Sequence, residues 1–233
     1  MKTLLLRTGL AMALALSAAA AFAANVPQSF TATYHVLQGG QPLGDATLTL
    51  KPAGNGQYEY TDKIVGTSGL AAALGASTSE VSRFAWVGKV PQAISYKYAM
   101  ASAFKPKNRE LAVQGNTVQV DDNGKHHSYP AQAGMVERNT LPLALGVALR
   151  DGARSATFPV GGRQNIETQT FKVSANEKIS VPAGSFDAVR VDRTDQDRAF
   201  NAWYVPAKYP VPVKIAQKDG GNLTLELVSY TQP

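Results

Sequence analysis

The stretch FTATYHVLQGGQPLGDATLTL, residues 30–50, shows the pattern that dominates this chain. Apolar and polar residues alternate in two runs, one on each side of the pair Gly39-Gly40. Alternation with a period of two places the apolar side chains on one face of a strand. Paired glycines accept the positive φ angles that a tight turn requires. The stretch therefore predicts two antiparallel strands joined by a turn.

The same pattern continues through most of the chain. Asn55-Gly56 and Gly115-Asn116 are turn signals between further alternating runs, and Gly220-Gly221 precedes the closing run. Many short strands separated by turns are typical of a sandwich or a barrel. We find no internal repeat and no change of composition, so residues 24–233 are expected to form a single β-rich domain.

Two segments depart from this pattern. SGLAAALGAS, residues 68–77, is alanine-rich and contains Gly75 as a stop, which predicts a short helix. TLPLALGVALRDGA, residues 140–153, has Thr140 as a possible cap and Gly152 as a stop. One apolar stripe of this second helix is formed by Leu141, Leu145, Ala148 and Leu149. Because such a stripe must be buried, we expect a mainly β fold: an antiparallel open or flattened β-barrel with one or two short helices, one packed on its concave face.

The first 23 residues resemble a bacterial secretory signal peptide. Lys2 and Arg7 precede an apolar run, and Ala21-Phe22-Ala23 fits the cleavage pattern of small residues. We therefore expect residues 1–23 to be removed, leaving a periplasmic or secreted protein without a transmembrane anchor. The chain has no cysteine, so its fold depends on its core alone.

The charge is mildly basic. The formal net charge is +6, and loss of the two basic residues in segment 1–23 leaves +4. A bias this small favours solubility and does not indicate nucleic-acid binding. The densest basic spot, Lys105 to Arg109, is predicted to be a solvated loop, with phosphate or lipid-headgroup contact as the alternative.

The corner VPAGS, residues 181–185, contains the serine that most resembles a nucleophile. A hydrolase elbow has the pattern Gly-x-Ser-x-Gly between a strand and a helix. Here Ser185 is followed by FDAVRV, which is strand-like, and no glycine stands at the required position. Pro182 and Gly184 suit a hairpin turn, so we interpret the corner as structural.

Metal and acid–base chemistry also find little support in the sequence. His126 and His127 are adjacent, and adjacent side chains on a strand point to opposite faces. Scattered carboxylates, Glu80 and Glu137 among them, have no distinctive spacing. We predict no catalytic residue, no metal site and no cofactor.

Aromatic residues within strands are the remaining candidates for a function. They either fill an ordinary core or, with the second helix, surround a cavity for one small ligand. The candidate lining residues are Trp86, Tyr96, Tyr98, Leu141, Leu145, Leu149 and Trp203.

The last third of the chain resembles a known bacterial family. ISVPAGSFDAVRVDR, AWYVPAKYPVPVKI and LTLELVSY are similar to a hairpin and two strands of the family called domain of unknown function 3108. The carrying positions are Pro182, Gly184, Phe186, Val191, Trp203, Pro212, Val213, Ile215, Leu225, Leu227 and Tyr230, with looser matches at Tyr34, Val36, Gly40 and Gly44. The resemblance implies a periplasmic or secreted protein without assigned catalytic residues.

These observations together predict a non-enzymatic protein. The expected function is to bind an apolar or amphipathic ligand, such as an envelope lipid. The alternative is an envelope protein-interaction or structural module without a ligand cavity, which would hold its partner by sheet edges or loops.

Overall fold

The computed structural model describes residues 26–103, 106–195, 200–217 and 222–233. The predicted signal peptide and the turn predicted at Gly220-Gly221 lie outside these residues. Two helices occur within them, α2 (Gly69–Ala73) and α3 (Leu141–Arg150), and both match helices that the sequence predicts. The strands are β1 (Phe30–Gln38), β2 (Gln41–Gly54), β3 (Gln57–Gly66), β4 (Ser77–Val87), β5 (Val90–Ala101), β6 (Lys107–Gln114), β7 (Thr117–Asp122), β8 (Lys125–Pro130), β9 (Val136–Glu137), β10 (Ser155–Gly161), β11 (Ile166–Val181), β12 (Gly184–Arg193), β13 (Phe200–Tyr204), β14 (Lys214–Gln217) and β15 (Leu223–Thr231).

All of these strands belong to one sheet. Its order is β8-β7-β6-β5-β4-β3-β2-β1-β15-β14-β13-β12-β11-β10-β9. Neighbouring strands are antiparallel except β9 and β10, which pair in parallel. The first strand, β1, pairs with the last strand, β15, in the middle of the sheet. One half of the sheet runs from β1 to β8, and the other runs from β15 to β9. This confirms the expected mainly β, antiparallel and open fold.

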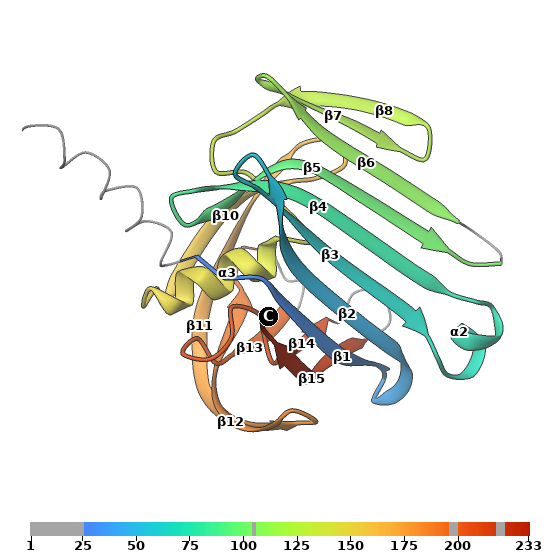
Figure 1. Ribbon diagram of the computed structural model, residues 1–233, viewed down its shortest axis with the longest axis vertical. Helices are drawn as coiled ribbons and strands as arrows, with labels where there is room; N and C mark the ends of the chain where they lie inside the picture. Colours follow the sequence, from blue (N-terminus) through green and yellow to red (C-terminus); the bar gives the residue numbers. More distant parts are fainter. Residues whose placement is uncertain (1–25, 104–105, 196–199, 218–221) are drawn as a thin grey trace, which may run out of the picture.

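The sheet curls but does not close. Its two edge strands, β8 and β9, are not paired with each other. Instead the N–H of Ala93 in β5 donates to the carbonyl of Met135, just before β9, at 2.8 Å. We call this line of approach between β5 and β9–β10 the seam. Beyond it β6, β7 and β8 extend as a three-stranded flap (Figure 1).

The alternation of apolar and polar residues explains why these segments form strands. Phe30, Ala32, Tyr34 and Val36 of β1 are buried, and the residues between them are partly or fully exposed. Asn55 and Gly56 have φ angles of 52° and 71°, as the predicted hairpin turn requires. Turn chemistry and hydrophobic pattern therefore agree over the first three strands.

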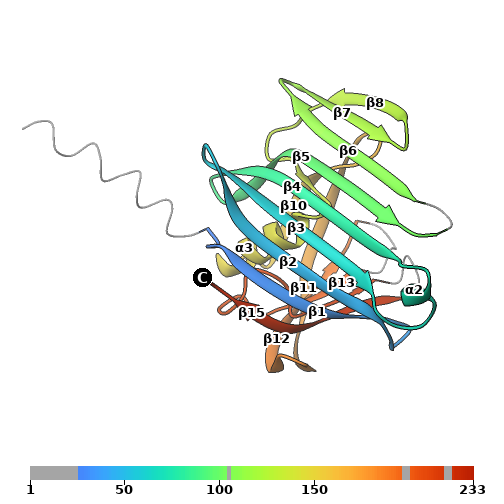
Figure 2. The same ribbon diagram turned by 45° about the vertical axis from the view of Figure 1, so that its right-hand side comes forward.

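Helix α3 fills the interior of the curl (Figure 2). Leu143 packs with residues of β1 to β4, while Leu141 and Leu145 pack with residues of β9 to β13. The helix is therefore buried more widely than the single predicted stripe, because the sheet surrounds it. A third cluster, including Leu111 of β6 and Met135, joins the flap to the seam.

One predicted detail of this helix is wrong. The Thr140 side chain makes no cap hydrogen bond to α3. Its hydroxyl donates instead to the carboxylate of Glu137 at 2.7 Å. A buried carboxylate is costly without donors, and Glu137 is only 1% exposed. The Thr140 hydroxyl, which the sequence predicts to cap the helix, therefore binds Glu137 instead.

Other predictions agree with the structure. Gly184 has a φ of 134°, and β11 and β12 form the hairpin predicted around Pro182. Gly152 has a φ of 85° two residues after the end of α3. Among the described residues, no helix combines the length and the apolar character that crossing a membrane requires.

Gly146 provides a test of the helix position. A Cβ atom at this residue would lie 1.9 Å from the carbonyl oxygen of Pro210. Because backbone cannot move aside as a flexible side chain can, we expect Gly146→Ala to lower the free energy of unfolding by about 1–3 kcal/mol. Urea unfolding followed by circular dichroism measures this change.

The matched control is Arg150→Ala at the exposed end of the same helix. It is expected to change the unfolding free energy by less than about 0.5 kcal/mol. Wild-type stability of Gly146→Ala would contradict the close contact between α3 and the Pro210 segment.

Candidate functional site

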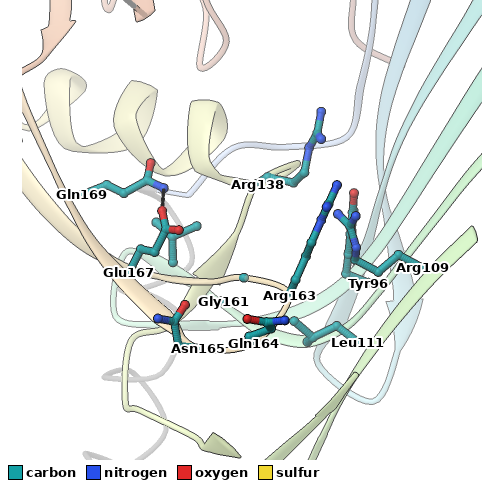
Figure 3. A pocket seen from close by; sticks show the side chains of 12 residues that line it. Tyr96, Arg109, Leu111, Arg138, Gly161, Arg163, Gln164, Asn165, Glu167 and Gln169 are labelled. Atoms are coloured by element: carbon teal, nitrogen blue, oxygen red, sulfur yellow. Dashed lines mark hydrogen bonds between the residues drawn. The ribbon is translucent and has the colours of Figure 1, made fainter. Parts of the chain in front are cut away.

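A pocket with a volume of about 610 Å³ lies at the seam. One wall comes from β5 and β6, and the other from β10, β11 and the turn between them (Figure 3). Arg138, which follows β9, completes the lining. We call this space the seam pocket. Its residues are Tyr96, Arg109, Leu111, Arg138, Val160, Gly161, Gly162, Arg163, Gln164, Asn165, Glu167 and Gln169.

Three guanidinium groups dominate this pocket. Asp122 links two of them, with its carboxylate oxygens 3.1 Å from Nε of Arg109 and 3.6 Å from Nε of Arg163. The ring of Tyr98 links Arg109 to Arg138, with centroid distances of 5.9 and 5.8 Å to the two Cζ atoms. The three side chains therefore form one continuous group, although they come from separate elements.

Arg138 is held in place by its neighbours in sequence. The carboxylate of Glu137 accepts the N–H groups of Asn139 and Thr140 at 2.8 and 3.2 Å. The amide of Asn139 donates to the hydroxyl of Ser82 in β4 at 2.9 Å. Burial raises the pKa of Glu137, and hydrogen bonds from Thr140 and Asn139 oppose that rise. The segment before α3 is thus fixed on both sides of Arg138.

Glu80 anchors the other end of Arg138. One carboxylate oxygen of Glu80 lies 3.1 Å from Nη2 of Arg138, and the other accepts the hydroxyl of Tyr96 at 2.6 Å. Glu80 is nearly inaccessible, whereas the Arg138 side chain is 59% exposed because it opens onto the pocket. Glu80 and the nearby tyrosines raise the pKa of Arg138 above its ordinary value. Arg138 is therefore a permanently charged donor.

Asp62 lies beside this group on the inner face of the sheet, opposite Glu80 in the register. Its Oδ1 atom is buried and has no hydrogen-bond partner among the residues that the structure describes. Burial raises the pKa of Asp62 to about 7, with Glu80 adding to the rise and Arg138 opposing it. The polar interior is therefore sensitive to pH in the neutral range.

The arrangement is suited to binding an anion. A guanidinium carries five N–H donors in a fixed fork, which matches carboxylate and phosphate groups. Each pocket arginine uses only part of this fork on its carboxylate neighbour. The described residues contain no group of three His, Asp or Glu side chains that could hold a metal ion.

The predicted lining residues are spread over several environments. Tyr96 lines the seam pocket, and Tyr98 stacks against two of its arginines. Leu141 is buried in the core around α3. Leu145 and Leu149 border a space of only about 10 Å³, the size of a single water molecule at most.

The two tryptophans lie away from the seam pocket. Trp86 packs edge to face with Phe84, with a ring-centroid distance of 5.1 Å, in the core of the N-terminal half. Trp203 is partly buried and packs against the same core cluster. Its indole N–H donates to Glu177 at 2.7 Å, and the charged ends of Arg190 and Lys214 flank its ring.

Ser185 and His126, which were considered as a nucleophile and a metal ligand, have the surroundings of ordinary surface residues. The hydroxyl of Ser185 lies 2.8 Å from that of Ser180 across the hairpin. His126 is on the exposed side of β8, 3.7 Å from Asp121.

Sequence reasoning found only part of this pocket. Tyr96 was a candidate lining residue, and Arg109 belonged to the basic spot for which phosphate contact was the alternative. The loop predicted for that spot is wrong at Lys107 to Arg109, because these residues belong to β6.

Arg138, Arg163 and Asp122 were not singled out, and Glu80 and Glu137 showed no distinctive spacing. One usable signal is the run VERN, residues 136–139, because charged and amide residues directly before a buried helix need partners. The arginines come together only because strands that are distant in the sequence pair with each other. Such pairing gives no signal in a short stretch of sequence.

Asp62 provides a pH test. Its folded-state pKa of about 7 lies above the value of about 3.9 for an unfolded aspartate. Between these values the folded protein binds more protons, so the Asp62 contribution to stability falls as pH rises through this window. Asp62→Asn lacks this loss and should gain stability relative to wild type between pH 5 and pH 8, measured by urea unfolding at each pH.

The exposed Asp187 supplies the control. Asp187→Asn should change the free energy of unfolding by less than about 0.5 kcal/mol, because its side chain is on the surface. A difference between Asp62→Asn and wild type that does not change with pH would show that the Asp62 carboxylate is not desolvated.

The fold is also found in another protein. A crystal structure of a β-barrel-like protein of domain of unknown function DUF1849 from Brucella abortus superposes with a TM-score of 0.55 at 10% sequence identity. The match covers 89% of this chain and 98% of the other. At this identity the likeness concerns the fold alone.

The sequence was also compared with curated proteins and with family models. No curated protein matches it significantly. The model of DUF3108, a family described as proteins of unknown function, matches residues 29–228. This range contains every strand from β1 to β14 and the seam pocket, and the chain therefore belongs to the DUF3108 family.

Proposed function

We propose that this chain is a non-enzymatic binding protein whose ligand is amphipathic and carries an anionic group. The observation that carries the proposal is the convergence of Arg109, Arg138 and Arg163 on the seam pocket. In the proposal the ligand's anionic group binds these guanidiniums. Its apolar part contacts Leu111 and Val160, which line the same pocket.

The pocket has a size and shape that support this proposal. Its volume of about 610 Å³ falls within the range of small-molecule sites. The turn Gly161–Asn165 is well fixed, because Tyr129 donates to the carbonyl of Gly162 and Gly162 N–H donates to Asn165. A rigid site loses less entropy when it binds its ligand. A purely apolar ligand is less well supported, because the interior around α3 is filled by packed side chains.

The proposed location is the periplasm. Segment 1–23 has the basic, apolar and small-residue parts of a signal peptide. An envelope compartment would also supply amphipathic anions.

A second candidate function is supported by the flap. In the described part of the chain the outer edge of β8 has no strand partner, so it is free to pair with a strand of another protein. A photo-crosslinker at His126, whose side chain is 79% exposed, would capture a partner at this edge.

The first proposal is tested with decyl phosphate as the probe. Isothermal titration of the natively processed protein should show binding, and Arg163→Gln should weaken it at least about tenfold. This magnitude follows from one charge-assisted hydrogen bond, worth about 1.5–3 kcal/mol. Arg163 is 63% exposed in a turn, so its replacement should not disturb the fold.

Two controls accompany this titration. Arg83→Gln removes an arginine that is 52% exposed on the outer face and should bind decyl phosphate as wild type does. Decyl glucoside, which has the same chain and no charge, should bind far more weakly. Equal binding of the two amphiphiles, or unchanged binding by Arg163→Gln, would refute the proposal.

A further inference from the structure

A second hollow adjoins the seam pocket. It has a volume of about 380 Å³ and is lined on the flap by Lys107, Arg109, Asp122 and Lys125, with Arg163 opposite. Arg109 and Arg163 line both hollows. The two spaces are therefore neighbours that share part of their walls.

The flap gathers these charges through its register. Arg109 in β6 is paired with Asp122 in β7, and Asp122 is paired with Lys125 in β8. Lys107 lies two residues before Arg109 and so points to the same face of β6. One cross-strand row thus leads from the seam pocket to the edge of the flap.

The second hollow has an excess of positive charge. Lys107, Lys125, Arg109 and Arg163 line it together with one carboxylate, that of Asp122. Asp122 is already shared between the two guanidiniums. Within the described ranges, neither lysine forms an ion pair. The two ammonium groups are therefore available to a second anionic group.

We propose that the two hollows form one site for a ligand that carries two neighbouring phosphate groups. One phosphate binds Arg138 and Arg163 in the seam pocket, and the second binds Lys107 and Lys125 at the flap. Arg109 lies between them and contacts both. This inference rests on the proposed function, because it names the ligand class of the same site.

The first experiment compares inorganic pyrophosphate with inorganic phosphate at constant ionic strength. Isothermal titration of the natively processed protein should give at least tenfold tighter binding of pyrophosphate. The double variant Lys107→Gln/Lys125→Gln should lose this preference and retain its affinity for phosphate. Arg163→Gln should weaken the binding of both anions, because Arg163 belongs to both hollows.

The matched control has the same change in net charge. Lys51→Gln/Lys97→Gln replaces two lysines on the outer face that are 62% and 64% exposed. It should keep the wild-type preference for pyrophosphate. If the control loses the preference to the same extent as the flap variant, the effect is a general one of charge and the two-phosphate site is wrong.

The outcomes also separate this inference from the proposed function. Binding of phosphate and decyl phosphate without a preference for pyrophosphate overturns the two-phosphate site and leaves the proposed function in place. Absence of binding by all three probes overturns both.

A final arm identifies the source of the phosphates. Vesicles of phosphatidylcholine with 20% cardiolipin, roughly one diphosphorylated lipid in five, are compared with phosphatidylcholine alone in a sedimentation assay. Binding that needs cardiolipin and is lost in Lys107→Gln/Lys125→Gln supports a site for a lipid headgroup. Pyrophosphate binding without vesicle binding supports the same site for a free diphosphate.

Discussion

The buried carboxylate of Glu137 is the interaction on which the centre of this molecule depends. It accepts hydrogen bonds from two backbone N–H groups and one hydroxyl within the next three residues. The turn that it stabilises leads directly into α3, the helix that fills the sheet. The same turn places Arg138 in the seam pocket. One desolvated acid thus connects the core of the protein with its candidate site, and its partners offset the cost of its burial.

The seam pocket exists because the sheet does not close at the seam. A fully closed barrel would satisfy its edges and bury its interior positions. Here β9 has only two residues, so the wall between β5 and β10 is thin and the flap extends beyond it. Charged residues are tolerated on the inner face of β6 and β7 because Arg109 and Asp122, both largely buried, pair with each other at 3.1 Å. Beside α3, the described side chains border a space of only about 10 Å³.

The strands and both helices were predictable because their signals are local. Alternation from Phe30 to Val36 and the turn at Asn55-Gly56 need no distant partner to be interpreted. The pocket was not predictable in the same way. Arg109, Arg138 and Arg163 are separated by 25 residues or more and meet only because the sheet curls. Tyr96 was identified as a candidate, but for its aromatic ring, whereas its hydroxyl bond to Glu80 depends on strand register. The width of the buried surface on α3 likewise depends on how far the sheet wraps around it.

The pairing of β1 with β15 has a consequence for the order in which the chain assembles. Thr33 and Ser229 are 196 residues apart, yet their hydroxyl groups lie 2.7 Å from each other. During synthesis β1 emerges first and its second partner emerges last. Until then the middle of the final sheet is an unpaired edge on each of two half-sheets, which is the kind of surface that aggregates. Contacts of such high sequence separation also slow folding. The edge of β1 therefore stays open to such pairing for as long as the synthesis of the rest of the chain takes.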